Sequence, residues 1–202
     1  MKVAAITITY NRLELTKKTL ESFYSKTKVD YHLIVDNGST DGTLDYIKDY
    51  DRLELPRNFG ISRAFQKAVE TLPECDYILK LDNDVETVTD EIIEKMVWFL
   101  DQSKNFCISP VDLLLDKNYK PRVLQKESRN GFKVEYTTHT GGAFQLAPAS
   151  VVRQLCKDFY HLNKGDWMIG KYYRLHGFNP AYLTELEIKH IGLNKTSPNY
   201  IL

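Results

Sequence analysis

Two aspartates with one residue between them, Asp82 and Asp84, are the clearest chemical feature of the sequence. Residues 77–81 have the pattern of a buried strand, and the two aspartates come just after it. Because side chains alternate along an extended segment, both carboxylates point to one side, where they repel by about 4 kcal/mol at roughly 4 Å. A divalent cation removes that cost and can also hold diphosphate oxygens. We interpret the pair as a metal and phosphate site, and a solvated turn with helix-capping acids is the alternative.

A third carboxylate, Asp36, ends another predicted strand at residues 31–35. Residues 37–42 have the composition of a turn, and Asp41 is predicted to cap the next helix. The turn does not explain an acid at the carboxyl end of a strand. A carboxylate in that position could accept a hydrogen bond from the N–H group of a nucleotide base.

Two more polar segments could bind a nucleotide. Thr9, Tyr10 and Asn11 end the first predicted strand, where Tyr10 could stack on a base or belong to the core. Residues 57–60 precede the third predicted helix, where backbone N–H groups and Arg63 could meet phosphate. A plain loop and a solvated helix face would explain this second segment as well.

The order of the predicted elements explains how these segments could come together. Strands are predicted at residues 3–10, 31–35, 53–55, 77–81 and 106–109, with helices between them, the last of which begins at Thr87 or Thr89. This order predicts an α/β fold with a mostly parallel central sheet flanked by helices, and ligands bind beyond the carboxyl ends of such strands. The last third is predicted to hold a hairpin around residues 129–131, helices at about 149–159 and 166–175, and a strand at about 182–188.

Composition limits the classes of protein that fit. A chain of 202 residues suits one domain, and 27 basic residues balance 27 acidic ones, so no overall basic field attracts nucleic acid. Three widely spaced cysteines indicate reduced thiols, and not a disulfide framework or a zinc site. No apolar run approaches the roughly 18 residues of a membrane span, and the N-terminal one is too short for a signal peptide. We therefore expect a cytoplasmic protein.

Together these segments resemble the inverting glycosyltransferases of family 2, which have the GT-A fold. The matching segments, in chain order, are Ile8-Thr9-Tyr10-Asn11-Arg12, Asp36-Asn37-Gly38-Ser39-Thr40-Asp41-Gly42-Thr43, Arg57-Asn58-Phe59-Gly60-Ile61-Ser62-Arg63-Ala64, Asp82-Asn83-Asp84, Gly141-Gly142-Ala143-Phe144, Gly165-Asp166-Trp167 and Ile188-Lys189-His190. The resemblance covers residues 2 to about 192. It implies a single GT-A domain over residues 1–202, with a nucleotide-sugar-binding half to about residue 110 and a smaller acceptor-binding and catalytic part from about residue 111.

The resemblance also implies roles for single residues. Asp36 would contact the base, most often uracil in this family, and Asp82 would contact the ribose or a metal-bound water. Asp84 and His190 would bind Mn²⁺ or Mg²⁺, and Asp166 would be the general base that takes the proton from the acceptor hydroxyl. The other residues implied at the donor are Thr9, Tyr10, Arg12, Asn58, Gly60, Arg63 and Asn83, and those implied on the acceptor side are Gly141, Gly142 and Trp167.

The expected reaction is metal-dependent transfer of one sugar from a nucleotide-sugar, a UDP-sugar above all, to an acceptor hydroxyl with inversion. Gly165 stands where the family has Glu, and no Gln-x-x-Arg-Trp follows, so the pattern of processive polysaccharide synthases is missing. One alternative is a nucleotidyltransferase on a related fold, although Tyr10-Asn11-Arg12-Leu13 lacks the glycine that its phosphate loop would need. The other alternative is a catalytically silent module that binds a nucleotide or a sugar.

The acceptor stays open between a saccharide, a lipid-linked glycan, a protein and a modified nucleic acid. Residues 111–140 resemble the family least and are locally basic, with Arg122, Lys126 and Arg129 among their cations. That bias would favour an anionic acceptor. The alternative is an ordinary solvated loop.

Overall fold

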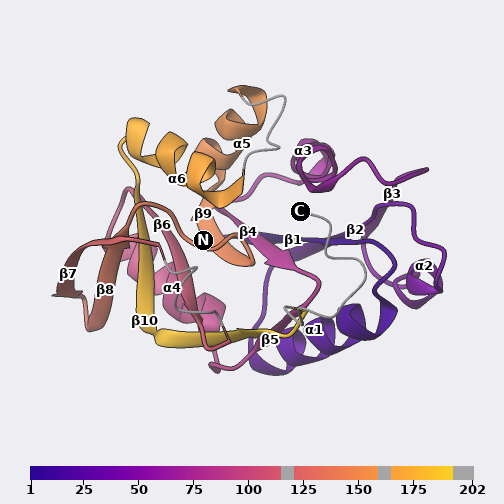
Figure 1. Cartoon of the computed structure of the whole chain (residues 1–202), viewed down its shortest axis with the longest axis horizontal. Helices are drawn as coiled ribbons and strands as arrows, with labels where there is room; N and C mark the ends of the chain where they lie inside the picture. The colour runs from indigo at the N-terminus through magenta and orange to yellow at the C-terminus, as the bar shows by residue number, and fades with distance from the viewer. Residues whose placement is uncertain (115–120, 159–164, 193–202) are drawn as a thin grey trace.

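The computed structural model of the chain describes residues 1–114, 121–158 and 165–192, and of residues 165–168 it describes the backbone only. One sheet runs through the middle of the molecule, and helices cover both of its faces (Figure 1). The strand order is β3-β2-β1-β4-β9-β6-β10-β8-β7, with β5 paired to β10. The predicted α/β class is thereby confirmed.

Parallel strands form the half of the sheet that carries the predicted nucleotide segments. They are β1 (Val3–Thr9), β2 (Tyr31–Asp36), β3 (Arg52–Glu54) and β4 (Tyr77–Asp82), and they are connected by α1 (Leu13–Lys26), α2 (Thr43–Tyr46) and α3 (Ile61–Thr71). The register of β1 sets Thr9 beside Asp36 and Ile8 beside Asp82. The carboxyl ends of these strands therefore meet at one edge, as predicted.

The other half of the sheet mixes parallel and antiparallel strands, and its order does not follow the order along the chain. β9 (Phe144–Pro148) runs antiparallel between β4 and β6 (Phe106–Asp112), so β6 has the direction of β4 without being its neighbour. β10 (Asn179–His190) pairs parallel with β6, and the hairpin of β7 (Val123–Arg129) and β8 (Phe132–Thr137) follows at the edge. The sequence does not predict β9, because the glycines before it and the proline at its end have the composition of a loop.

A short strand, β5 (Val85–Thr87), lies where the sequence predicts the start of a long helix. It pairs antiparallel with the end of β10, and Val85 lies opposite His190. Helix α4 (Ile92–Gln102) begins only after Glu91, whose φ of 54° interrupts the helical backbone. The residue after Asp84 is therefore tied to the strand that carries His190.

Alternation along the strands divides the core into two layers. Leu79 and Leu81 of β4 face the layer that holds Met96 of α4, whereas Ile78 faces the layer of α3, α5 (Ala149–Asp158) and α6 (Gly165–Leu175). In Figure 1, α3, α5 and α6 lie above the sheet and α1 lies below it. In the described part of the chain, no helix is both long and apolar enough to cross a membrane.

The three cysteines, Cys75, Cys107 and Cys156, are free thiols. Burial raises the pKa of each of them, and that of Cys156 reaches about 12. A thiol with a raised pKa is a poor nucleophile at neutral pH. Cysteine chemistry therefore has no part in the site described next.

Candidate active site

Asp82, Asp84 and His190 form a cluster at the carboxyl edge of the parallel strands. One ligand atom from each lies within 4.8 Å of the other two, and Oδ1 of Asp84 lies 2.9 Å from Nε2 of His190. The pairing of β5 with β10 brings these distant segments together, and the backbone N–H of Ile191 donates to the carbonyl of Asp84 at 2.8 Å. Two carboxylates and an imidazole form a donor set that a divalent cation can use.

After β10 the chain passes directly over this cluster. Gly192 lies so close to Asp84 that an added Cβ would be 2.0 Å from Oδ2 and 2.6 Å from Cγ. The backbone of Gly192 is not in the positive-φ region. Position 192 therefore requires a glycine because of space, and not because of its backbone conformation.

Opposite charges on both sides keep Asp84 ionised. Nη1 of Arg12 lies 2.5 Å from its Oδ2. Burial alone would raise the pKa of Asp84, but the hydrogen bond with His190 and the charges of His190 and Arg12 hold this pKa below its usual value. Burial would lower the pKa of His190, and the contact with Asp84 and the charges of Asp82 and Asp112 raise it instead. Asp84 is thus ready to serve as a ligand.

Two further residues contact the cluster, and sequence reasoning misses both. Lys80 forms an ion pair with Oδ1 of Asp82. Burial raises the pKa of Asp82, and the charge of Lys80 offsets only part of this rise. In the sequence, Lys80 could be recognised as a lysine among the apolar residues that lead to Asp82, because a charge in a buried strand needs a partner. Asp112, at the end of β6, accepts the backbone N–H of His190 at 3.0 Å, and its other oxygen lies 4.0 Å from Nδ1. Asp112 has no comparable signal, because it follows a strand in the region that resembles the family least.

Asp36 lies on the same edge and is only 2% exposed. Its Oδ2 accepts the backbone N–H groups of Gly38 at 3.1 Å and Ser39 at 2.9 Å. Its Oδ1 is buried and has no hydrogen-bond partner among the described residues. A buried carboxylate oxygen without a donor is costly, so this atom points to a ligand that supplies one.

The turn after Asp36 packs against residues 57–60. A Cβ at Gly38 would lie 2.6 Å from Cα of Arg57, so the two loops touch through their backbones. The side chain of Asn37 bonds Asn58 at 3.0 Å, and Oδ1 of Asn58 also accepts the N–H of Gly60 at 2.8 Å. Asn58 and Gly60 therefore shape the entrance to α3 beside Asp36.

The remaining donor-side predictions separate into buried and exposed residues. Thr9 and Asn83 are buried, and Nδ2 of Asn83 donates to the hydroxyls of Thr9 and Thr16 at 3.1 and 3.2 Å. This bonding joins β1, α1 and the turn after β4. Tyr10 is 43% exposed, so it does not belong to the core, and Arg63 is exposed on α3.

The predicted acceptor segment, Gly141-Gly142, is held by side chains from neighbouring strands. The N–H of Gly141 donates to the hydroxyl of Tyr182 at 2.7 Å, and Ser109 donates to the carbonyl of Gly141 at 3.3 Å. Lys80 donates to the carbonyl of Gly142. The backbones of Asp166 and Trp167 lie in the first turn of α6, and their side chains are outside the described residues.

Two basic residues of the β7–β8 hairpin are paired with acids of the same hairpin. Lys126 is paired with Glu135 and Arg129 with Glu127, and the guanidinium of Arg129 lies 5.7 Å from the centre of the Phe106 ring. The hairpin is also at the far edge of the sheet from β3, β2 and β1. These contacts support the reading of an ordinary surface over that of an anion-binding one.

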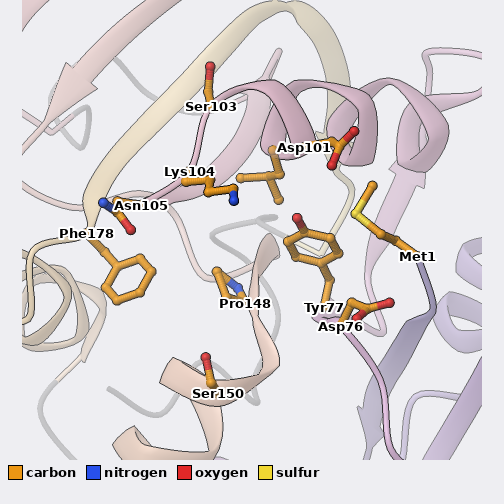
Figure 2. Close-up of a pocket in the computed structure, with 11 residues that line it drawn as sticks. Met1, Asp76, Tyr77, Asp101, Ser103, Lys104, Asn105, Pro148, Ser150 and Phe178 are labelled. Carbon is orange, nitrogen blue, oxygen red and sulfur yellow. The ribbon is translucent and has the colours of Figure 1, made fainter.

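A cavity of about 330 Å³ lies away from this cluster. Its lining includes Asp76 and Tyr77 at the start of β4, Lys104 after α4, and Pro148 at the end of β9 (Figure 2). Asp82 is at the opposite end of β4. The cavity is therefore separate from the edge where the carboxylates gather.

The chain is similar to known proteins over most of its length. Residues 4–155 match Glycosyl transferase family 2. The glycosyltransferase TuaG of Bacillus subtilis (strain 168), whose name assigns it to teichuronic acid biosynthesis, is 27% identical over 120 residues, which are 55% of this chain and 47% of TuaG.

Solved structures show the same fold at low identity. The mannosyltransferase PcManGT of Pyrobaculum calidifontis, in complex with GDP-Man and Mn²⁺, has a TM-score of 0.77 at 15% identity over 96% of this chain and 58% of its own. S. aureus TarS 1-349 in complex with UDP-GlcNAc has a TM-score of 0.72 at 15% identity over 98% of this chain and 62% of its own. The chain thus spans about half the length of TuaG and about three fifths of these two. The fold is GT-A, and because the family match spans more than half of the sequence, the chain belongs to glycosyltransferase family 2.

Proposed function

We propose that the protein moves one sugar from a UDP-sugar to an acceptor hydroxyl, with inversion and with the help of Mn²⁺ or Mg²⁺. The observation that carries the proposal is the cluster of Asp82, Asp84 and His190 beside the buried, unpaired oxygen of Asp36. The GDP-Man with Mn²⁺ in PcManGT and the UDP-GlcNAc in TarS agree with a nucleotide-sugar donor. In this proposal residues up to about 110 hold the donor, and later residues hold the acceptor.

The residues of the cluster fit a divalent cation. Asp84 and His190 would hold it, and Asp82 would contact the ribose or a metal-bound water. When bound, such an ion neutralises charge on a departing nucleoside diphosphate. The guanidinium of Arg12 forms an ion pair with Asp84, and this planar cation can also bind phosphate oxygens.

The chemistry of Asp36 favours uridine. The free Oδ1 of an ionised carboxylate can only accept, and uracil offers an N–H at N3. Cytosine N3 and adenine N1 are acceptors, so these two bases can donate to the buried oxygen only through their exocyclic amino groups. Guanine also has an N–H at N1, so GDP-sugars are the competing donors that a screen must include.

The test of the proposed function is a donor screen. Hydrolysis and transfer would be measured for UDP-, GDP-, CDP- and ADP-sugars with Mn²⁺, with Mg²⁺ and with excess EDTA. We expect turnover of a UDP-sugar that needs the metal, and product analysis that shows inversion at the anomeric carbon. Binding of UDP without turnover of any donor would favour the silent binding module.

Asp166 is proposed as the general base, because the start of α6 is where the family resemblance places it. Asp166→Asn keeps the size and the capping ability of the side chain. We expect this variant to retain UDP binding and to lose transfer by about 10²-fold or more. Transfer at a rate near that of the wild type would place the base elsewhere.

A further inference from the structure

Lys80 lies in β4, two residues before Asp82, so its side chain leaves the same face of the strand. The side chain is only 17% exposed. A partly buried ammonium is stable only when anionic or carbonyl oxygens replace its water. Lys80 finds a carboxylate oxygen of Asp82 and the carbonyl oxygen of Gly142.

These two contacts belong to different parts of the site. Asp82 is in the donor-side cluster, at the end of a parallel strand. Gly142 is in the segment that leads into β9, which is antiparallel to β4. The other side chains that hold this segment, Ser109 and Tyr182, come from β6 and β10 and bond Gly141. Lys80 thus contacts both an aspartate of the cluster and the segment that leads into β9.

We propose that Lys80 is a positioning residue for sugar transfer, which fixes the Asp82 carboxylate and the Gly142 carbonyl at one separation. This inference rests on the proposed function. Lys80 holds Oδ1 of Asp82. The first effect of Lys80 is to keep donor and acceptor aligned. The second is electrostatic, because its positive charge weakens the attraction of the cluster for a free cation.

The two effects predict opposite changes in one variant, Lys80→Met, which keeps the length of the side chain. Without the ammonium, we expect free Mn²⁺ to bind about tenfold more tightly, measured by electron paramagnetic resonance. The kcat of transfer should fall by about tenfold or more, while the KM for the donor changes little. Lys80→Arg keeps the charge, so it should bind Mn²⁺ like the wild type and recover part of kcat.

The control is Lys26→Met, which removes another lysine–aspartate pair, the solvent-exposed one of Lys26 with Asp90. It should leave both Mn²⁺ affinity and kcat unchanged. A parallel loss of melting temperature, Mn²⁺ affinity and kcat in Lys80→Met would mean a structural role and would overturn the proposal. So would a kcat within twofold of the wild type.

The same experiment separates this proposal from the proposed function. If the wild type turns over no nucleotide-sugar, the proposed function fails and no kcat can be compared. The Mn²⁺ measurement still applies, because it uses the free protein. Unchanged Mn²⁺ affinity in Lys80→Met would then overturn the role of Lys80 at Asp82, and tighter binding would support it.

Discussion

Asp84 is the side chain on which the most contacts of the site converge. One carboxylate oxygen faces His190, the other faces Arg12, and the backbone of Gly192 lies against it. These contacts leave little freedom of rotation. A residue held in this way is sensitive to loss of charge even when its size is kept.

Asp84→Asn should therefore separate charge from shape. We expect UDP binding in Mn²⁺ to weaken by about tenfold or more, because the amide is a poor ligand for the cation. Calorimetry with Mn²⁺ and with excess EDTA measures this loss. Asp90→Asn, an exposed aspartate paired with Lys26, is the matched control and should bind UDP normally. The metal assignment is wrong if EDTA leaves the UDP affinity of the wild type unchanged.

A buried histidine outside the site sets the response of stability to acid. Nε2 of His32 lies 2.9 Å from the Thr7 hydroxyl and Nδ1 lies 2.7 Å from that of Tyr24, and burial lowers its pKa from 6.5 to about 4. Between these values the unfolded chain binds more protons, so the contribution of His32 is present above pH 6.5 and is lost as the pH falls toward about 4.

The loss amounts to at most about 3 kcal/mol, since one pKa unit corresponds to about 1.4 kcal/mol. Urea unfolding at several pH values between 7.5 and 4 would measure it. His32→Gln keeps hydrogen bonding but does not titrate, so its free energy of unfolding should fall less steeply. Parallel curves for the two proteins would show that carboxylates, and not His32, dominate the response.

At the scale of elements, α6 owes its position to one glycine. A Cβ at Gly170 would lie 2.4 Å from Cβ of His139 and 2.6 Å from the carbonyl oxygen of Thr138. Both contacts are with the segment that leads to Gly141. The helix that begins at Gly165 thus lies directly against the backbone that leads to the predicted acceptor segment.

Gly170→Ala should move α6 away from this segment. We expect transfer to an acceptor to fall more than donor hydrolysis, since the donor side is built from other strands, and we expect a lower melting temperature. Both rates and the thermal transition would be measured, with the exposed Lys171→Ala as the control in the same helix. Equal losses of hydrolysis and transfer would show that α6 supports the whole fold and has no special part in acceptor placement.

The sequence predicts the parallel half of the sheet well, because β1, β2 and β4 combine apolar strands with polar ends. The carboxyl ends of parallel strands meet at one edge of a sheet, so the sequence could place Asp36 and Asp82 at the same edge. The partnership of Asp84 with His190 came from family resemblance, because no local pattern pairs β5 with β10. Lys80 and Asp112 belong to the site only because of contacts between neighbouring strands. The sequence does not predict which of these strands are neighbours.

At the scale of the whole molecule, the strands that carry the predicted nucleotide segments and the β7–β8 hairpin lie at opposite ends of the sheet. β7 and β8 form one edge and β3 forms the other. The ion pairs of Lys126 and Arg129 are internal to the hairpin, so its net field is small. An anionic acceptor gains little from such a surface.

Replacing Arg122, Lys126 and Arg129 together with Ala should leave acceptor kinetics unchanged at low and at high salt. A small loss of stability is expected, because Arg129 also stacks on Phe106. Initial rates at two ionic strengths and a thermal melt would test this. A higher KM for the acceptor at low salt alone would restore the hypothesis of an anionic acceptor.

The contact of Gly192 with Asp84 gives the sequence a marker that can be read without any structure. A chain with a side chain at this position cannot keep the carboxylate where it stands here, because the first carbon of that side chain would overlap it. The residue two places after the histidine of the last strand therefore divides similar sequences into those that can share this position of the aspartate and those that must place its carboxylate differently. We expect Gly192→Ala to weaken the proposed binding of a cation although Asp82, Asp84 and His190 are all retained.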